Sequence, residues 1–541
     1  MSNPATSRPT VAYFCMEYGL HTDLKLYAGG LGILAGDYLK GAHDHERPIV
    51  GLGIKWKQGY TDQRIGDDGR PYDSYPVREY DLVDTGVVVP VTIRDHEVHV
   101  KVWRTEAYGN APIYLLDTDI EPNAAPDRWI CGQLYGWFAE ERLAQEIVLG
   151  VGGVRALRAL GIDVDVYHFN EGHAVLAALE LIQERRSQGV DFEDAWQATR
   201  DEVVFTTHTP VIQGNESHEL RTMEYMGATR GLTLEQMERI GGDPFNMTVA
   251  ALRVARRANA VAELHAETAN DMWEHVDGRC EIVPITNCIH TPTWVDPRIT
   301  AAFAAGQPLR PVHDEIKSEL IDFIEERTGA RLRQDRIIIG FSRRAAPYKR
   351  SDLVFSDMDR IGPYLERGDV QIVFSGKAHP LDDTGKDIVA QLVEMSRRFP
   401  NAVVFLQDYD MEIGKMLTRG SDVWLNNPRR PQEASGTSGM KAAMNGVLNC
   451  SVLDGWWPEA CEDGVNGWQI GDGFESDDVD ELDEHDAAAL YAVLLDKVLP
   501  TFSDDPERWE SMMRASIQST SERFAVERML DDYERLLYRT G

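Results

Sequence analysis

The second half of the chain alternates short apolar runs with amphipathic stretches, and this alternation constrains the fold more than any other feature. The apolar runs are nearly continuous, as in IIIGFSR and AVVFLQD, rather than apolar at every second position. Strands of this kind are buried on both faces, which is typical of a parallel sheet covered by helices. We expect strands at 337–343, 371–376, 402–408, 422–427 and 447–453, and helices at 352–366, 384–398 and 411–418 and from about residue 439.

The first half carries similar strands at wider spacing. VAYF at 11–14, VVFTTHT at 203–209 and IVPITN at 282–287 are expected to be buried strands. Four prolines lie between residues 292 and 312, and we interpret this stretch as the joint between the halves. The predicted class is therefore α/β, with two Rossmann-like lobes and a site in the cleft between them, outside the carboxyl ends of the strands. The predicted domains are an N-terminal lobe at 1–296, a C-terminal lobe at 297–505, and C-terminal helices at 506–541 that pack back on the first lobe.

The chain is strongly acidic, with 55 Lys and Arg against 89 Asp and Glu in 541 residues, a formal net charge of -34. A surface of this sign repels phosphate backbones and anionic lipids, so neither nucleic acid nor a membrane surface is an expected partner. The six cysteines form no C-x-x-C pair, so we expect no disulfide framework and no zinc cluster. The N-terminus has no apolar secretory segment, and no apolar run approaches the roughly 20 residues that span a bilayer. A cytoplasmic location is therefore expected.

The strongest candidate site is the segment NNPRRPQEASGTSGMKAAMNG at 426–446. It follows an expected strand and presents a run of small residues and then Lys441 at the head of a helix. Small residues let backbone amides approach an anion, and a helix N-terminus adds about half a positive charge. Lys441 can act as a point charge or, when desolvated, as an amine nucleophile. The alternative interpretation is an ordinary tight strand-to-helix turn with a solvated lysine.

A second cluster, FSRRAAPYKR, gathers four basic residues just past an expected strand. They are Arg343, Arg344, Lys349 and Arg350. Such a concentration in an acidic chain predicts a local anion site, in which arginine can grip phosphate through two parallel hydrogen bonds. The alternative is that these cations offset neighbouring carboxylates. The acidic run at 472–486 is expected to be a solvated loop that leads into the N-terminus of a helix.

Weaker candidates lie at other strand ends. The Gly-rich turn AGGLG at 28–32 suits a phosphate or a closely packed ligand, but it does not match the dinucleotide pattern G-x-G-x-x-G. His208 and Asn287 end expected strands where each can hydrogen-bond a sugar hydroxyl, although a single histidine in such a place is more often structural. HFNEGH at 168–173 does not have zinc-protease spacing, and we expect Asn170 to cap the following helix. No metal site is expected.

The segment around Lys441 and its neighbours resembles a known family. EASGTSGMKAAMNG, with NNPRRP before it and SVLDGWW after it, is similar to the pyridoxal-phosphate segment of retaining α-glucan (glycogen and maltodextrin) phosphorylases of the compact bacterial and archaeal type. Further segments agree in order: YFCMEYGL, YAGGLGILAGDYLKGA, HFNEGHA, TTHTP, ITNCIHTPTW, SRRAAPYKR and GKAHP. The resemblance covers nearly the whole chain. It implies a GT-B fold and the reversible phosphorolysis of an α-1,4-glucan end, which releases glucose 1-phosphate with retention.

The resemblance also implies a cofactor, pyridoxal 5′-phosphate, and roles for individual residues. The implied cofactor-binding residues are Lys441, which would hold the pyridoxal as a Schiff base, and Thr437, Ser438, Arg343, Trp294 and Gly30. The implied catalytic residues are Lys441, His208, and Arg344 and Lys349, which would bind orthophosphate. The implied substrate-binding residues are Glu433, Ala434, Ser435, Gly436, Asn287, His208 and Leu31. Because the cofactor phosphate would touch the substrate phosphate, several cations must compensate the repulsion between them.

Four departures from the family pattern leave an alternative open, and one of them is Ala346-Pro347 in SRRAAPYKR. THTPVIQGNESHEL at 207–220 and WKQGYT at 56–61 also differ from the pattern, and Cys15 stands where serine is common. The alternative is a diverged retaining glycosyltransferase of the same fold, which moves a sugar from a sugar phosphate or nucleotide sugar to a small acceptor. A third reading is a non-enzymatic carbohydrate-binding relative, against which the intact Lys441 and Arg344 argue. The expected partners are a sugar substrate and orthophosphate or glucose 1-phosphate. A homodimer is compatible with these expectations.

Overall fold

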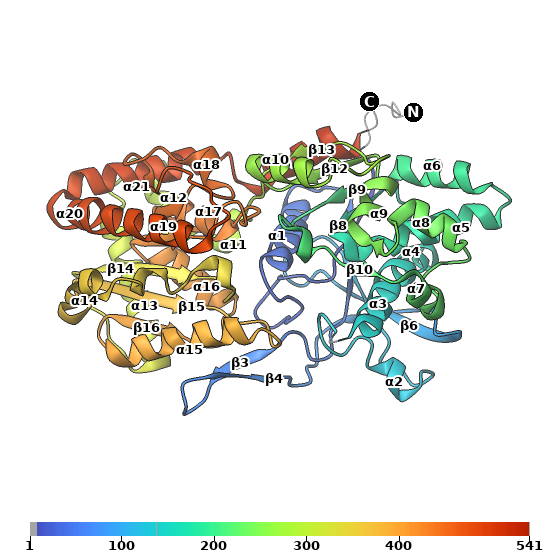
Figure 1. Cartoon of the computed structure of the whole chain (residues 1–541), viewed down its shortest axis with the longest axis horizontal. Helices are drawn as coiled ribbons and strands as arrows, with labels where there is room; N and C mark the ends of the chain where they lie inside the picture. The colour runs from blue at the N-terminus through green and yellow to red at the C-terminus, as the bar shows by residue number, and fades with distance from the viewer. Residues whose placement is uncertain (1–7, 137, 540–541) are drawn as a thin grey trace. The chain divides into compact units, whose positions relative to one another are not determined.

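The computed structural model describes residues 8–136 and 138–539. These residues divide into two compact units (Figure 1). The second unit consists of Thr61–Ser74 and Asn287–Arg528, and the first unit holds the described residues before, between and after these two segments. The predicted domains divide the chain differently. They put 61–74 and 287–296 in the first lobe, and they group 506–528 with the C-terminal helices.

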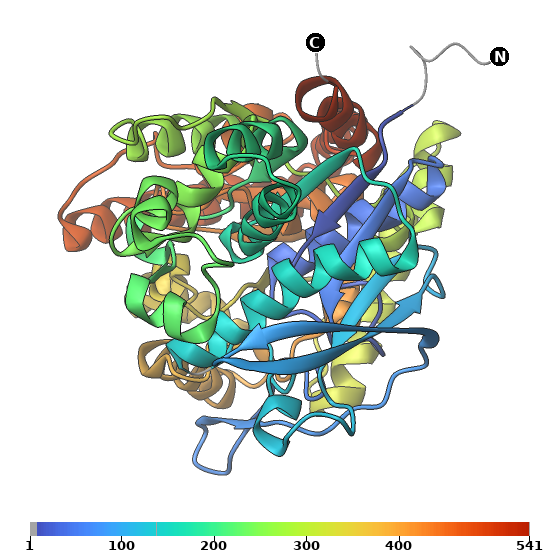
Figure 2. The ribbon, with the colours of Figure 1, turned by 90° about the vertical axis from the view of Figure 1, so that its right-hand side faces the viewer.

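The first unit is built on a nine-stranded mixed sheet in the order β13-β12-β9-β8-β1-β2-β7-β6-β5. Its strands are β1 Val11–Phe14, β2 Ile49–Ile54, β5 Val83–Ile93, β6 His96–Thr105, β7 Ile113–Asp117, β8 Val166–Asn170, β9 Val203–Thr206, β12 Arg257–Ala260 and β13 Ile282–Pro284. In this sheet order, all neighbouring strands from β13 through β7 pair in parallel. Every residue of β1, β8 and β9 is buried. The ribbon of β5 and β6 is antiparallel (Figure 2). Buried and exposed residues alternate near the end of β5, as a one-sided sheet requires.

Helices and a small second sheet complete the first unit. The helices are α1 Gly30–Asp44, α2 Ala125–Arg128, α3 Ala139–Ile147, α4 Gly153–Leu160, α5 Leu176–Ser187, α6 Phe192–Glu202, α7 Leu220–Met226, α8 Leu234–Gly241, α9 Met247–Val254 and α10 Glu263–Met272. The strands β10 Ser217–His218 and β11 Phe245–Asn246 form an antiparallel pair. The chain ends in α22, Val526–Tyr533, and a π-helical turn at Glu534–Tyr538.

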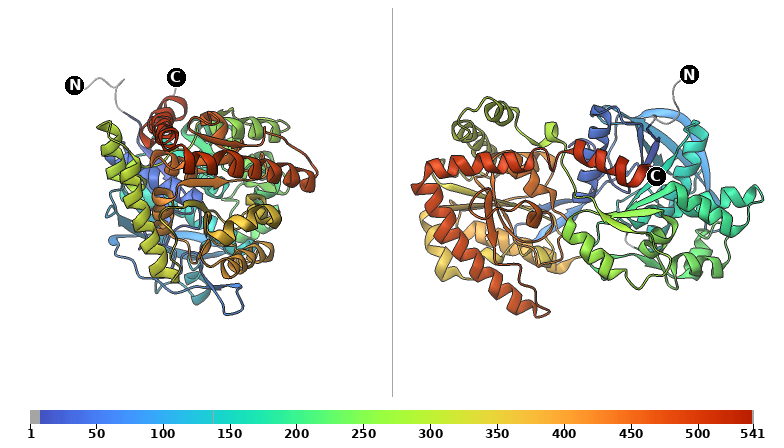
Figure 3. Two further views of the ribbon diagram at one scale, coloured as in Figure 1. Left: turned by 90° about the vertical axis from the view of Figure 1, so that its left-hand side faces the viewer. Right: turned by 90° about the horizontal axis from the view of Figure 1, so that it is seen from above.

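A buried chain of hydrogen bonds ties the end of the protein to the first unit. The Tyr538 hydroxyl lies 2.5 Å from the Tyr38 hydroxyl of α1 and 2.8 Å from Nδ1 of His168 on β8. His168 Nε2 lies 2.6 Å from the hydroxyl of Thr206 on β9. The view from above in Figure 3 shows the dark-red C-terminal helix beside the blue N-terminal elements. Tyr538 therefore belongs to the core of the first unit.

The second unit contains a six-stranded sheet, all of whose pairings are parallel, in the order β16-β15-β14-β17-β18-β19. The strands are β14 Ile337–Ser342, β15 Val370–Ser375, β16 Val403–Leu406, β17 Val423–Asn426, β18 Leu448–Val452 and β19 Gly467–Ile470. Ile337 and Ile339 of β14 pack in a core cluster with the helices on one face, whereas Ile338 packs in a different cluster. The sheet is thus covered on both faces. The five strands predicted here are confirmed, and the mixed α/β class with parallel sheets is confirmed with them.

Eleven described helices surround this sheet. They are α11 Thr291–Trp294, α12 Pro297–Ala304, α13 Arg310–Thr328, α14 Met358–Arg367, α15 Asp383–Arg398, α16 Met411–Gly420, α17 Thr437–Met444, α18 Trp457–Ala460, α19 Val479–Val493, α20 Leu499–Asp504 and α21 Pro506–Thr520. The proline-rich stretch interpreted as a joint lies entirely in this unit, where it forms α11, α12 and the start of α13.

The hairpin of β3 Asp62–Ile65 and β4 Pro71–Ser74 also belongs to the second unit. The Gln63 amide donates to the Ala378 carbonyl at 3.1 Å, and Lys377 Nζ donates to the Thr61 carbonyl at 2.8 Å. These contacts explain why a segment between two strands of the first unit packs with the second. This packing could not be predicted from the sequence, because the hairpin's partners lie more than 300 positions away.

Two further predictions can be compared with the fold. All six cysteines are free thiols. Among the described residues, no helix is both long enough and apolar enough to cross a membrane. Trp56, Trp294, Trp456 and Trp457 are all at most 2% exposed and therefore belong to the core.

Candidate functional site

The turn before α17 is shaped by one glycine. Gly436 has φ +84, a left-handed conformation that favours glycine over residues with a β-carbon. A β-carbon there would also lie 3.3 Å from Oε1 of Glu433. The α17 helix begins immediately afterwards at Thr437, and the first amides of a helix have no partner within it. Their N–H groups and the positive end of the helix dipole therefore make this turn suitable for an anion.

Lys441 lies in the middle of α17 and is 5% exposed. Its Nζ lies 3.4 Å from the ring centroid of Trp294, which is fully buried. Asn445 connects the two elements, because its side-chain amide donates to the carbonyls of Lys441 at 2.8 Å and of Trp294 at 3.2 Å. The structure thus places an amine against an aromatic ring in a largely water-free environment. Sequence reasoning missed Asn445, which reads as an ordinary helix-end residue.

Glu433 joins the basic cluster to this turn. Arg343 Nη2 and Lys349 Nζ both donate to the same oxygen of Glu433, and the three side chains are at most 8% exposed. Arg343 also donates to the Ser438 hydroxyl at 3.1 Å. Burial would raise the pKa of Glu433, but the charges of Arg343 and Lys349 outweigh it and hold this pKa below the usual range. Two cations therefore form ion pairs with the same carboxylate, that of Glu433.

Asp454 is a second carboxylate here, and sequence reasoning missed it. It is fully buried, and its side chain accepts from the backbone amides of Glu433 at 2.9 Å and Gly455 at 2.8 Å. Burial, followed by the charge of Glu433, raises the pKa of Asp454 to about 7. The carboxyl therefore shapes the loop that carries Glu433.

The four predicted cations separate into two kinds. Arg344 is exposed, and within the described part of the chain its guanidinium makes no hydrogen bond or ion pair. Arg350, in contrast, is 2% exposed and pairs with Asp483 at 2.9 Å and Asp486 at 2.6 Å. The interpretation of Arg350 as part of the anion site is therefore wrong. Its partners come from the acidic run at 472–486, which begins α19 as expected but is not solvated throughout.

A separate cluster in the first unit surrounds His208. Its Nε2 lies 2.7 Å from Oδ1 of Asn170, and the Asn170 amide donates to Sγ of Cys15 at 3.2 Å. Burial, assisted by the nearby His265, lowers the pKa of His208 to about 3, so the ring is neutral. The expectation that Asn170 caps the next helix is wrong, because Glu171 caps the short 3₁₀ turn at Gly172–Ala174. Asn170 ends β8 and orients His208 instead.

The Gly-rich turn at the start of α1 is partly occupied by the chain itself. Glu17 Oε2 accepts from the amides of Ala28 at 2.7 Å and Gly29 at 3.1 Å. The interpretation of this turn as a phosphate site is therefore wrong for these two amides, because a buried carboxylate already uses them. A β-carbon on Gly30 would meet nothing within 4 Å, so this side of the turn is open. Leu31 follows it in the first turn of α1.

The remaining predicted residues lie in the second unit. Asn287 is the first residue of that unit's long segment, and its side-chain oxygen is buried without a hydrogen-bond partner in the described part of the chain. Ser435 is 3% exposed, and its hydroxyl is likewise buried without a partner. Ala434 and Thr437 are half-buried beside them. The structure therefore gathers the predicted cofactor and phosphate residues of the second unit around one turn, and it gathers His208 with Asn170 in the first.

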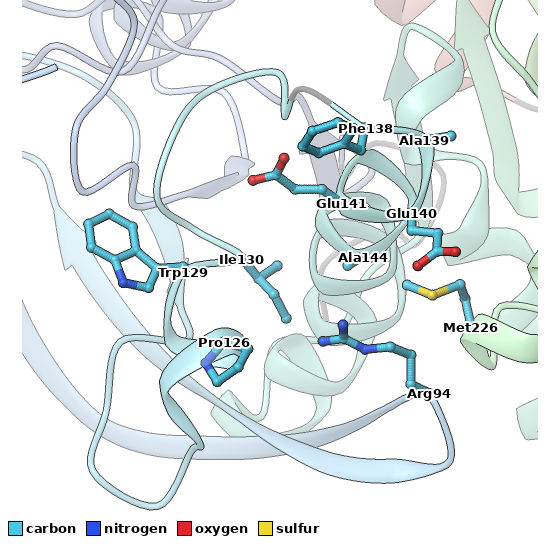
Figure 4. A pocket seen from close by; sticks show the side chains of 10 residues that line it. All are labelled: Arg94, Pro126, Trp129, Ile130, Phe138, Ala139, Glu140, Glu141, Ala144 and Met226. Atoms are coloured by element: carbon cyan, nitrogen blue, oxygen red, sulfur yellow. The ribbon is translucent and has the colours of Figure 1, made fainter. Parts of the chain in front are cut away.

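Two other features of the first unit do not involve the predicted residues. A pocket of about 560 Å³ is lined by the exposed rings of Trp129 and Phe138, with Arg94 on another part of its wall (Figure 4). Glu146, Glu216 and His218 form the one cluster of metal-ligand type among the described residues. Arg142 lies 3.0 Å from Glu216 and 3.4 Å from Glu146, so this cluster already contains a balancing cation.

Comparison with known proteins places the chain in a family. Residues 300–533 match the family model described as carbohydrate phosphorylase. The maltodextrin phosphorylase of Thermococcus litoralis is 37% identical over 98% of this chain and 70% of its own length. An uncharacterized protein of Methanocaldococcus jannaschii is 38% identical over 98% of this chain and its full length, and the glycogen phosphorylase of Aquifex aeolicus is 34% identical over 98% and 86%. These similarities span both units, and the protein belongs to the carbohydrate phosphorylase family.

Proposed function

We propose that this protein is a retaining α-glucan phosphorylase, which uses orthophosphate and pyridoxal 5′-phosphate to release glucose 1-phosphate from an α-1,4-glucan or maltodextrin. The observation that carries the proposal is the buried amine of Lys441 against Trp294, next to two cations stored on Glu433. The maltodextrin and glycogen phosphorylases among its relatives support it. In this proposal the two units are the Rossmann-like lobes of a GT-B fold.

The residues around Lys441 fit pyridoxal 5′-phosphate. Lys441 offers a buried amine, Trp294 an aromatic face, and Ser435 a buried hydroxyl that has no hydrogen-bond partner among the described residues. Thr437 and Ser438 offer hydroxyls and helix N-terminal amides for the phosphate. When bound, the cofactor would supply a phosphate group that can give a proton to the substrate phosphate and take it back.

The cations are proposed to bind the substrate phosphate. Arg344 is exposed and makes no hydrogen bond or ion pair with any described residue, so it can meet an incoming anion first. Lys349 and Arg343 are tied to Glu433, and they can turn toward a phosphate when Glu433 changes partners. Two phosphates held in contact repel each other strongly in a desolvated site, and these three cations would compensate that charge.

Glu433 is proposed to change partners when the substrates bind. Once its cations turn to phosphate, its carboxylate is available to accept hydrogen bonds from sugar hydroxyls, together with the backbone of Ala434, Ser435 and Gly436. Neutral His208 of the first unit would contact the sugar, and Leu31 of the same unit would close over it. Asn287, which belongs to the second unit, would be a further sugar contact. The charge that develops at the anomeric carbon would then be stabilised by the adjacent phosphate dianion.

The direct test offers purified protein maltodextrin and orthophosphate and measures glucose 1-phosphate. We expect the product to form, and we expect it to require both Lys441 and orthophosphate. Formation of glucose 1-phosphate at the same rate by Lys441→Ala would contradict the proposal. A protein that makes no glucose 1-phosphate but transfers a sugar from a sugar phosphate or nucleotide sugar to a small acceptor would instead be the diverged glycosyltransferase.

A further inference from the structure

Glu171 has a backbone conformation that is almost reserved for glycine. It follows β8 directly, with φ +76 and ψ 164. Residues with a β-carbon are strained by about 1–3 kcal/mol in such sparsely populated regions, and strain of this kind is retained where the surroundings over-determine it. The strained position carries a glutamate, although the next residue, Gly172, could adopt this conformation without strain. The contacts of the Glu171 side chain show what its carboxylate does there.

The Glu171 carboxylate faces three donors and holds the loop after β9. Its Oε1 accepts from the backbone amide of His208 at 2.5 Å and from the hydroxyl of Thr209 at 3.0 Å. Its Oε2 accepts from the amide of Gly172 at 3.1 Å. The backbone amide of Glu171 donates to the Thr206 carbonyl at 2.9 Å. A carboxylate satisfies three donors, whereas an amide of the same size would place an N–H group against at least one of them.

The ring of His208 is fixed from its other side. Asn170, adjacent to Glu171, presents its amide oxygen to His208 Nε2 at 2.7 Å, while its amide nitrogen donates to Cys15. An amide oxygen only accepts, so Nε2 of the neutral ring carries the hydrogen and Nδ1 keeps its lone pair. Adjacent residues on one strand end thus control both the backbone position and the tautomer of His208.

We infer that Glu171 is a positioning residue, which holds the main chain of His208 and Thr209 so that the His208 ring presents its Nδ1 lone pair to a sugar hydroxyl. The inference rests on the proposed function, in which His208 contacts the sugar. Its role is local to the sugar, because its contacts all lie in the first unit and the phosphate-binding cations all lie in the second. A change at Glu171 should therefore affect the two substrates unequally.

The experiment compares three variants of the full chain. Glu171→Gln keeps the size of the side chain and removes the second acceptor oxygen. Glu171→Gly removes the carboxylate but relieves the backbone strain, so a loss of function in this variant does not come from strain. Glu180→Gln is the matched control, because Glu180 is a 5% exposed glutamate of the same unit whose carboxylate pairs with Arg155 and Arg230.

For both Glu171 variants we expect the KM for maltodextrin to rise at least about tenfold, which corresponds to the loss of roughly one hydrogen bond's worth of orientation. The KM for orthophosphate should stay within about twofold of the wild-type value. Glu171→Gly is relieved of the backbone strain but leaves three donors without their acceptor, so it should unfold at or below the wild-type temperature. Glu180→Gln should lower the unfolding temperature and leave both KM values unchanged. A purely structural role predicts instead that KM follows stability, with no selectivity for the sugar.

Maltodextrin binding by calorimetry separates this inference from the proposed function. If wild-type protein forms no glucose 1-phosphate but binds maltodextrin, and Glu171→Gln binds it at least about tenfold more weakly, the positioning role stands and the phosphorylase proposal fails. If wild type is active and both Glu171 variants keep the wild-type KM for maltodextrin, the positioning role is overturned. An equal rise in the KM of both substrates would also overturn it.

Discussion

Replacing Glu433 by glutamine tests whether this carboxylate stores the phosphate-binding cations. Arg343 and Lys349 share one oxygen of Glu433, and all three side chains are at most 8% exposed. The Glu433→Gln variant keeps the shape of the side chain but leaves both cations without a counter-charge. An anion that enters this place should then be bound more tightly, because it no longer competes with Glu433.

The magnitude follows from the burial of the pair. Removing one partner of a buried ion pair costs about 3–5 kcal/mol, because an uncompensated charge remains in a site of low dielectric. An orthophosphate that recovers even about 1.4 kcal/mol of this would bind tenfold more tightly. We therefore expect Glu433→Gln to destabilise the second unit in phosphate-free buffer and to lower the Kd for orthophosphate at least about tenfold.

The assay is a thermal unfolding series at increasing orthophosphate, combined with calorimetric titration. Asp422→Asn is the matched control, since Asp422 is 3% exposed and pairs with Lys317 at 2.6 Å elsewhere in the same unit. Both variants should lose stability, but only Glu433→Gln should recover it steeply with phosphate. Equal phosphate dependence in the two variants, or weaker phosphate binding by Glu433→Gln, would refute the reasoning.

Three further predictions concern other groups. Arg344→Ala should raise the KM for orthophosphate at least about tenfold and leave the KM for maltodextrin unchanged. The reason is that the Arg344 guanidinium makes no structural contact among the described residues. Steady-state kinetics measure both values, and an equal rise in the two KM values would count against the proposed role. Lys441→Ala should abolish glucose 1-phosphate formation while circular dichroism remains that of wild type, and retained activity would exclude the proposed cofactor attachment. Burial lowers the pKa of His265 to about 4. Below about pH 6.5 the unfolded chain therefore binds a proton that the folded chain does not, and the free energy of unfolding decreases as the pH decreases from about 6.5 to about 4. Between pH 7.5 and 5.5, denaturant unfolding should show wild type losing about 1 kcal/mol more than His265→Gln, and parallel pH curves would contradict the neutral state of this histidine.

The parallel sheet of the second unit could be predicted because each of its predicted strands is recognisable from its own residues. Each of the five predicted strands is an apolar run that both faces of the sheet bury, so hydrophobicity alone identifies it. The strand β19, GWQI, was not predicted, since a four-residue run with a glycine and a glutamine carries little of that signal. A strand could therefore be predicted from the sequence where both of its faces are buried.

The partners of charged residues could not be predicted in the same way. Arg350 reads like Lys349 in the sequence, but its partners Asp483 and Asp486 lie more than 130 positions away. Glu17 likewise occupies amides of a turn that, in the sequence alone, looks free for a ligand. Charge and residue type indicate that a group can bind an anion, whereas only the fold shows which groups are already bound.

Glu171 illustrates a third kind of residue, whose role depends on backbone geometry. The sequence HFNEGH drew attention to Asn170 as a cap, and nothing in it indicates that the next residue has a positive φ. Its partner His208 lies on a different strand end. A glutamate before a glycine at the end of a buried strand is a signal worth testing in such chains, because the turn there requires unusual backbone conformations.

The measurement that tests the central claim most directly is the absorption spectrum of the purified protein, followed by borohydride reduction and peptide mapping. The account predicts an absorption band at longer wavelength than the aromatic residues produce, and a reduced pyridoxyl group on the peptide that contains Lys441. A protein that shows glucan phosphorolysis without that band, or that carries the group on a different lysine, would contradict the account.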